Sequence, residues 1–134
     1  MGVADDFATR MVNFGNIGVL TPVPTIFIGT MPAMPDQCTG IRVTGGMEGV
    51  YAMGRTLGAL VTQHAVQVLA RALTFSAAET LAWRVYAALD NWEGTLNGNV
   101  YLRIVARHPP YSVGQDEQQR TVFTCNYVAQ RRDR

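Results

Sequence analysis

The sequence predicts an α+β domain, in which one largely antiparallel or mixed sheet of about four to five strands carries two main helices. Two segments repeat apolar residues at helical spacing, and several others alternate apolar and polar residues as strands do. Their order is helix, two strands, strand, helix, two strands, which is typical of helices packed on one face of a sheet. With 134 residues, we expect a single domain over 1–134.

The first helix is expected over residues 3–14. Asp5 and Asp6 lie in its first turn, where the helix dipole favours carboxylates, and Gly15 offers a stop. The apolar stripe recurs every three or four residues. It consists of Val3, Phe7, Met11 and Phe14.

Two short strands are expected next, over 25–30 and 38–44. The stretch between them, 31–36, holds two prolines and cannot lie inside a sheet. Gly45 and Gly46 are expected to end the second strand.

A glycine-rich loop is expected at about 45–62. It carries five glycines, and its apolar residues have no helical or strand period. A loop of this kind is a candidate for ordering against a partner. The residues between the glycines include Met47, Tyr51, Met53, Arg55 and Leu57.

Residues 64–73 are expected to form a strand with Gln67 and Arg71 on the face away from the core. The core face would consist of Val66, Val68, Ala70 and Ala72.

The second helix is expected to begin with Ser76 as N-cap, because Glu79 completes a Ser-x-x-Glu capping box. Trp83 falls about 140° from the centre of the core stripe at 3.6 residues per turn. It therefore points away from the core, and either packs under a loop or contacts another subunit. The core stripe itself consists of Ala78, Leu81, Ala82, Val85 and Leu89.

The last two strands are expected over 100–107 and 120–128, paired antiparallel. The prolines in 108–117 make that segment an extended or turn connection. The C-terminal arginines form a short basic tail, either solvated or in contact with a partner. In the first of these strands the alternation places four residues inward, Val100, Leu102, Ile104 and Ala106, and three outward, Tyr101, Arg103 and Arg107.

Charge and composition exclude several functions. The net charge is +1, so no bulk electrostatic attraction draws the chain to nucleic acid or anionic membranes. There is no lysine, which excludes a Walker A loop and a Schiff-base lysine. Charged residues make up only 16%, which suggests a surface partly covered by copies of the same chain. No run of about 20 apolar residues occurs, so we expect a soluble protein without a membrane segment.

No catalytic or metal-binding cluster is visible in the sequence. His64, His108, Cys38 and Cys125 lie far apart and lack ligand neighbours at short spacing, so we expect no metal and no cofactor. A Cys–His nucleophile pair assembled in space stays open, as does a small enzyme with a scattered site. The cysteines could pair only if their Cα atoms came within about 7 Å.

Several stretches together resemble one protein family. They are residues 27–36, 42–46, 65–71, 77–89 and 120–127. In this order and spacing they are similar to the tail-terminator and minor-capsid (tail completion) proteins of long-tailed bacteriophages and gene transfer agents. The resemblance spans about residues 17–128. The stretch 45–61 departs from it, with more glycine and more apolar residues than the family has there.

The resemblance implies a structural virion protein of the neck or tail, not an enzyme. Such proteins form a ring, commonly of six subunits, that caps the tail tube, stops polymerisation and joins the tail to the head connector or stopper protein. Genomic DNA passes through the lumen without sequence-specific binding. A tail-tube subunit or connector adaptor of the same fold is the alternative.

If the chain forms such a ring, we expect contacts between subunits or rings from three parts of it. The loop residues would face a neighbouring ring or the lumen, and the terminal arginines a partner. The expected contact residues are Met47, Tyr51, Met53, Arg55, Gln67, Arg71, Trp83, Arg84, Arg131 and Arg132.

Overall fold

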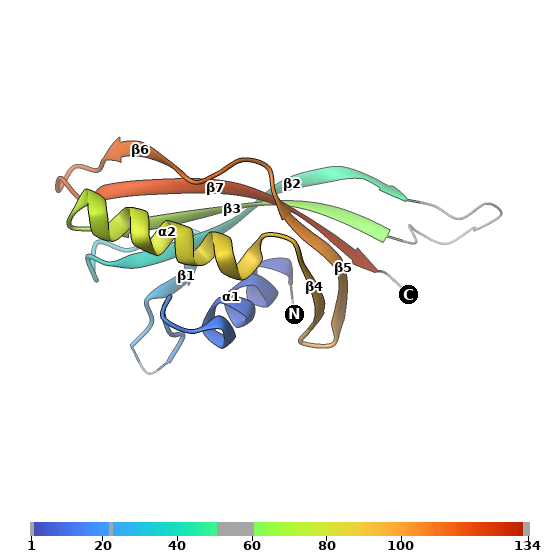
Figure 1. The fold of residues 1–134 in the computed structure, drawn as a ribbon. Helices are drawn as coiled ribbons and strands as arrows, with labels where there is room; N and C mark the ends of the chain where they lie inside the picture. Colours follow the sequence, from blue (N-terminus) through green and yellow to red (C-terminus); the bar gives the residue numbers. More distant parts are fainter. Residues whose placement is uncertain (1, 22, 51–60, 133–134) are drawn as a thin grey trace.

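The computed structural model describes residues 2–21, 23–50 and 61–132. In these residues two helices lie on one face of a seven-stranded sheet of order β1-β2-β3-β7-β5-β4, with β6 also paired to β7 (Figure 1). The helices are α1 (Val3–Phe14) and α2 (Phe75–Leu89). The strands are β1 (Ile26–Ile28), β2 (Cys38–Val50), β3 (Val61–Ala72), β4 (Trp92–Leu96), β5 (Asn99–Ala106), β6 (Tyr111–Gln115) and β7 (Thr121–Arg132).

The α+β class with two helices is confirmed, but the expected strand number is too low. All strand pairs are antiparallel except β1 with β2. The unforeseen strands are β4 and β6. Every residue of β6 is exposed, so no apolar alternation could reveal it, and the segment read as a connection pairs with β7 instead.

The core lies between the helices and one face of the sheet. The predicted stripe of α2 is buried, and so are the predicted core residues of β3. On α1 the stripe holds for Val3, Phe7 and Met11, while Phe14 at the helix end is exposed beneath the Arg10 guanidinium. Gly15 ends this helix with a positive φ, as expected. None of the described helices is long and apolar enough to cross a membrane.

Helix α2 begins earlier than the capping box predicted. Thr74 is the N-cap, and its hydroxyl accepts a hydrogen bond from the Ala77 backbone N–H at 3.1 Å. Ser76 therefore lies inside the first turn. The earlier start makes Phe75 helical and places its ring edge-on to Phe123, with 5.1 Å between centroids.

A β-bulge in β5 reverses the predicted alternation of its first half. Tyr101 pairs with Arg131 but Arg103 pairs with Gln130, so Leu102 is an extra residue in the ladder. As a result Tyr101 is buried, at 1% exposure, and Leu102 is 41% exposed. Both were assigned to the wrong face, because one extra residue moves every side chain before it to the other side.

The glycines at 45 and 46 do not end β2, which continues to Val50 and pairs with β3 from Val61 onward. Met47 thus lies in a strand, opposite Gln63. The other expected loop contacts, Tyr51, Met53 and Arg55, lie outside the described residues.

The C-terminal arginines at 131 and 132 likewise belong to a strand and not to a tail. β7 continues to Arg132, and Arg131 pairs with Thr62 on one side and Tyr101 on the other.

Asp6 fastens α1 to the β4–β5 hairpin and is more than the helix-start residue predicted. Its buried carboxylate accepts hydrogen bonds at 2.8 Å from the side-chain amides of Asn97 and Asn99, and another from the Tyr101 hydroxyl. Burial and this bond to Asp6 both raise the pKa of Tyr101. Asn97 and Gly98, both at positive φ, form the two-residue hairpin turn that presents these donors.

Replacing Asp6 by alanine should destabilise the fold by about 2–4 kcal/mol. The Asn97 and Asn99 amides and the Tyr101 hydroxyl would then lose their shared acceptor at a buried position. Asp5→Ala is the matched control. Asp5 accepts one exposed hydrogen bond from the Gly2 N–H, and its loss should cost less than about 1 kcal/mol. Urea unfolding followed by circular dichroism measures both, and equal losses would contradict the role of Asp6.

Candidate functional site

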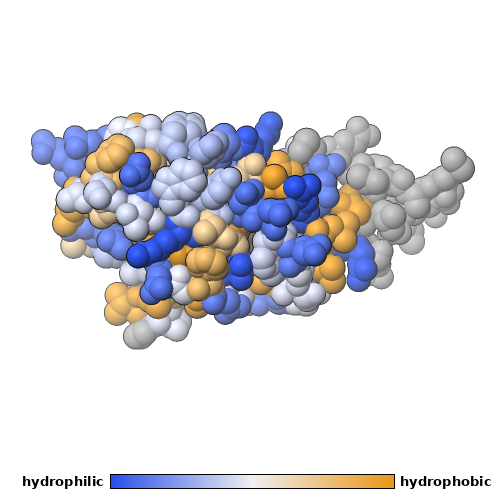
Figure 2. Space-filling view, viewed as in Figure 1, coloured by the Kyte–Doolittle hydropathy of each residue, from blue (hydrophilic) through white to orange (hydrophobic). Residues whose placement is uncertain are grey.

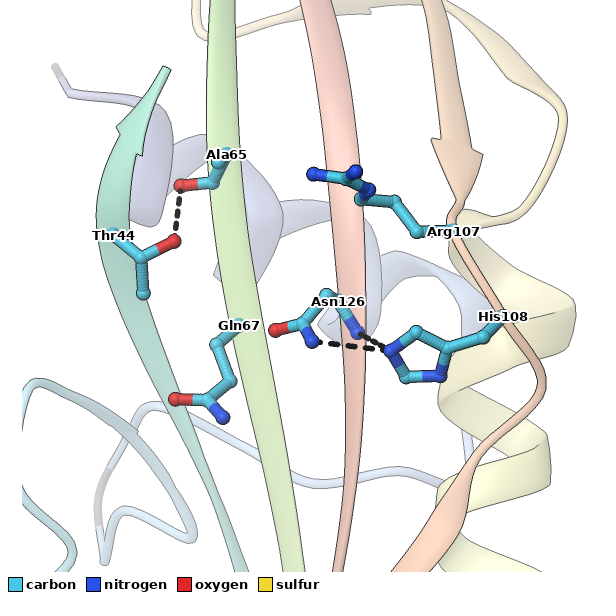
Figure 3. Close-up of a pocket in the computed structure, with 6 residues that line it drawn as sticks. All are labelled: Thr44, Ala65, Gln67, Arg107, His108 and Asn126. Carbon is cyan, nitrogen blue, oxygen red and sulfur yellow. Dashed lines mark hydrogen bonds between the residues drawn. The ribbon is translucent and has the colours of Figure 1, made fainter.

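The face of the sheet opposite the helices carries rows of polar side chains. In β3, Val66 and Val68 face the helices, so Gln63, Ala65 and Gln67 face the other way. Figure 3 views this face, with the helices behind the strands. The strand register aligns the side chains in rows across the sheet.

One row crosses β2, β3 and β7 and ends in arginine on both sides, since Arg107 directly follows β5. Arg42 pairs with Gln67, Gln67 with Asn126, and the Arg107 N–H donates to the Asn126 carbonyl at 2.8 Å. Four residues along, Gln63, Gln130 and Arg103 form a second row. Small apolar residues lie between the two rows: Ala65, Val128 and Val105.

The first row borders a pocket of about 550 Å³. It is lined by Thr44, Ala65, Gln67, Arg107, His108 and Asn126 (Figure 3). Five of the six lining residues carry polar side chains, and some of these groups are already hydrogen-bonded within the chain. Thr44 donates to the Ala65 carbonyl, and Gln67 donates to the Thr124 hydroxyl at 3.1 Å. The Arg107 guanidinium extends over β7 without a partner in the described part of the chain (Figure 3).

His108 and Cys125 lie close together, but not as a nucleophile and its base. The imidazole Nε2 faces the backbone N–H and side-chain amide of Asn126, at 3.3 and 3.1 Å, and Nδ1 lies 2.8 Å from the Pro109 carbonyl. The Cys125 thiol donates to the His108 carbonyl, not to its ring. Burial raises the pKa of this thiol, so the protonated form is favoured. The geometry gives Cys125 no general base.

The two cysteines are free thiols, and strand β3 lies between the strands that carry them. In the described residues no three His, Cys, Asp or Glu side chains gather as a metal site would require.

Two buried arginines, Arg71 and Arg120, hold the proline-containing stretch 31–36; we call this pair the arginine clamp. Arg71 donates to the carbonyls of Pro32 and Pro35, at 2.7 and 2.6 Å, and to that of Asp36 at 3.2 Å. Arg71 does lie on the face away from the helices, as the alternation predicts, but the stretch 31–36 covers it and leaves it only 4% exposed. The proline-containing stretch covers this end of the sheet, and sequence alternation alone could not reveal that cover.

Arg120 completes the clamp from the start of β7. It donates to the Ala33 carbonyl and forms ion pairs with Asp36 at 3.3 Å and Asp116 at 2.8 Å. Hydrogen bonds from the Arg120 backbone and side chain lower the pKa of Asp116. This contribution to stability is therefore present at neutral pH and is lost as the pH falls through that lowered pKa.

A third feature is the outer face of α2. Trp83 is 44% exposed and lies edge-on to Tyr86 of the same helix, at 5.1 Å between centroids. The prediction that it points away from the core is confirmed. The neighbouring Arg84 is exposed and donates to the Asn16 carbonyl at 3.3 Å. An intersubunit role for either residue stays a prediction.

The family model described as "Bacteriophage tail terminator protein" matches residues 14–132. The chain belongs to this family. Tail terminators are structural components of the virion, so the expected location in the neck or tail is confirmed.

Among solved structures, a chain from "Virion of native gene transfer agent (GTA) particle" superposes with a TM-score of 0.69. The alignment covers 97% of this chain and 94% of that one, at 12% sequence identity. At this identity the match establishes that this tail terminator shares its fold with that virion protein. No curated protein matches the chain.

Replacing Arg71 by lysine should destabilise the protein by about 2–4 kcal/mol, because a single ammonium cannot reach three carbonyls in the geometry of the guanidinium fork. Arg42→Lys, an exposed change on the same sheet, is the control and should cost less than about 0.5 kcal/mol. Urea unfolding gives both values, and limited proteolysis should show faster cleavage within 31–36 in the Arg71 variant alone. Similar stability of the two variants would contradict the clamp.

Proposed function

We propose that this protein forms a ring of six copies that caps the tail tube, ends tail polymerisation and joins the tail to the head connector. The observation that carries the proposal is the family match, which extends over almost the whole described chain. The similarity in fold to a gene transfer agent virion protein supports it. In the ring, genomic DNA passes through the lumen without sequence-specific binding.

The sheet offers two different edges, as a closed ring requires. In a ring each subunit presents one surface to the neighbour on one side and a different surface to the other. β1 pairs with β2 only at Thr39–Ile41, so the outer edge of β2 over 42–50 carries no strand in the described residues. β4 lies at the opposite edge. Open edges can bind a neighbour through main-chain hydrogen bonds.

Exposed apolar side chains also favour an assembled state. Val23, Met34 and Leu73 are each more than 60% exposed. Figure 2 shows apolar residues at several places among the polar ones on the helix-bearing side. A chain with only 16% charged residues would cover part of this surface on assembly.

Trp83 is the proposed anchor of an intersubunit contact, with Arg84 beside it. A half-exposed tryptophan on a rigid helix has the character of an interface hot spot. Gln67, Arg131 and Arg132, together with the segment that carries Met47, Tyr51, Met53 and Arg55, remain proposed contacts with a neighbouring subunit or ring.

The experiment adds the purified protein to tail-tube subunits during polymerisation and measures tube lengths by electron microscopy. We expect shorter tubes as the protein concentration rises, because each capped end stops growing. Trp83→Arg should weaken capping at least about tenfold, as loss of a hot-spot residue does. Trp83→Phe, which keeps an aromatic ring, is the matched control.

Both variants should retain the circular dichroism spectrum and melting transition of the parent. An unfolded Trp83→Arg protein would place Trp83 in the core and contradict the assignment. Unchanged tube lengths with the parent protein would overturn capping, and long stacks of the protein alone would identify a tube subunit.

A further inference from the structure

We infer that the open sheet face binds the phosphate backbone of duplex DNA, independently of sequence. The face, called here the basic face, consists of Arg42, Gln63, Arg103, Arg107, Asn126 and Gln130. The inference rests on the proposed function, because it assigns the surface that meets the genome inside the ring.

The three arginines of the basic face are spread over distances that suit a duplex. Arg103 and Arg107 lie four residues apart along one strand direction, or about 13 Å at the rise of a β-strand. Arg42 and Arg107 are separated by three strand spacings, or about 14 Å. These distances are close to the roughly 12 Å width of the major groove, so the guanidiniums can reach phosphates on both sides of it.

The arginines of this face form no ion pair with the other described residues. β3, β5 and β7 contain no Asp or Glu, and the carboxylate residue of β2 is Glu48, six residues from Arg42. Arg42, Arg103 and Arg107 form no ion pair or hydrogen bond through their guanidiniums with other described residues. The fold therefore leaves three free cations together on one face, which an anionic partner would complement.

Four other arginines of the described chain donate hydrogen bonds within the fold itself. Arg10 donates to the Ala88 carbonyl and Arg84 to that of Asn16. Arg71 and Arg120 form the clamp. The contrast shows that the basic face does not use its arginines to stabilise the chain.

The side chains of the basic face favour DNA over an acidic protein surface. Its rows combine guanidinium and amide groups, which are common donors to phosphate oxygens. The rows and the small residues between them include no Trp, Tyr or Phe, and the aromatic rings at their border are those of His108 and Tyr111, which contact each other beside Asn126. Because the strands of this face present no element that could enter a groove, the contact would be with the duplex backbone.

The test is fluorescence anisotropy of a labelled 25-base-pair duplex titrated with the full chain at 50 mM salt. Two duplexes of unrelated sequence should bind with the same Kd, below about 10⁻⁴ M. With three phosphate contacts, the slope of log K against log salt should be about −2.7. No binding of the parent protein up to 10⁻⁴ M would overturn the inference.

Single variants locate the contact. Arg42→Gln, Arg103→Gln and Arg107→Gln should each weaken binding about three- to tenfold on both duplexes and reduce the salt slope by about 1. Arg10→Gln, which removes the same charge from the helix side, is the matched control and should leave both unchanged, with its melting transition as the check on folding. Equal losses in the control would show an effect of net charge only and would overturn the assignment to this face.

Two further readouts separate the alternatives. If poly-glutamate displaces the duplex at lower concentration than unlabelled DNA does, the face serves an acidic protein and the inference falls.

A variant that combines Arg42→Gln, Arg103→Gln and Arg107→Gln is also tested for tube capping, with its melting transition as the control for folding. A parent protein that caps tubes but binds no DNA would remove this inference alone, while one that binds DNA but caps no tube would remove the proposed function.

Discussion

The arginine clamp is the constraint on which the rest of the architecture depends. β1 and β2 are adjacent and parallel, yet only residues 29–37 connect them, so the chain must double back without a helix. The prolines keep this turn out of the sheet, so several of its carbonyls have no strand partner. Arg71 and Arg120 satisfy these carbonyls with fixed forks of donors, and those bonds offset the cost of burying two charges. Lysine could not replace them, and the chain contains none.

With that end of the sheet covered, the two faces serve different purposes. One face packs against α1 and α2 and supplies the core, fastened by the buried carboxylate of Asp6. On the other face, beyond the clamp, the arginines at 42, 103 and 107 are exposed and the amide side chains are half-buried. The bulges at Thr44 and Leu102 decide which residues reach which face, since each inserts one residue into an otherwise alternating ladder. The chain thus presents a polar surface without loss of core packing.

Sequence periodicity predicted the elements that bury one face in the core and leave the other face outside it. The α2 stripe and the Val66–Ala72 alternation were correct because each meets the core on one side and solvent or polar cover on the other. Contacts from distant segments could not be predicted, such as the carbonyls that bury Arg71 or the amides of Asn97 and Asn99 that bind Asp6. The dipeptide Asn97-Gly98 is typical of a two-residue hairpin turn, but the expected elements did not include the β4–β5 hairpin that it forms. The family was predicted from the order of weak motifs, which the match over 14–132 confirms.

We propose that the protein completes a tail by closing into a ring on the end of its tube. The most direct measurement is native mass spectrometry of preassembled tail tubes incubated with the purified protein, with negative-stain images of the same sample. The account predicts six added copies per tube and extra density at one end only. Binding along the tube, open-ended addition of copies, or no added mass would contradict it.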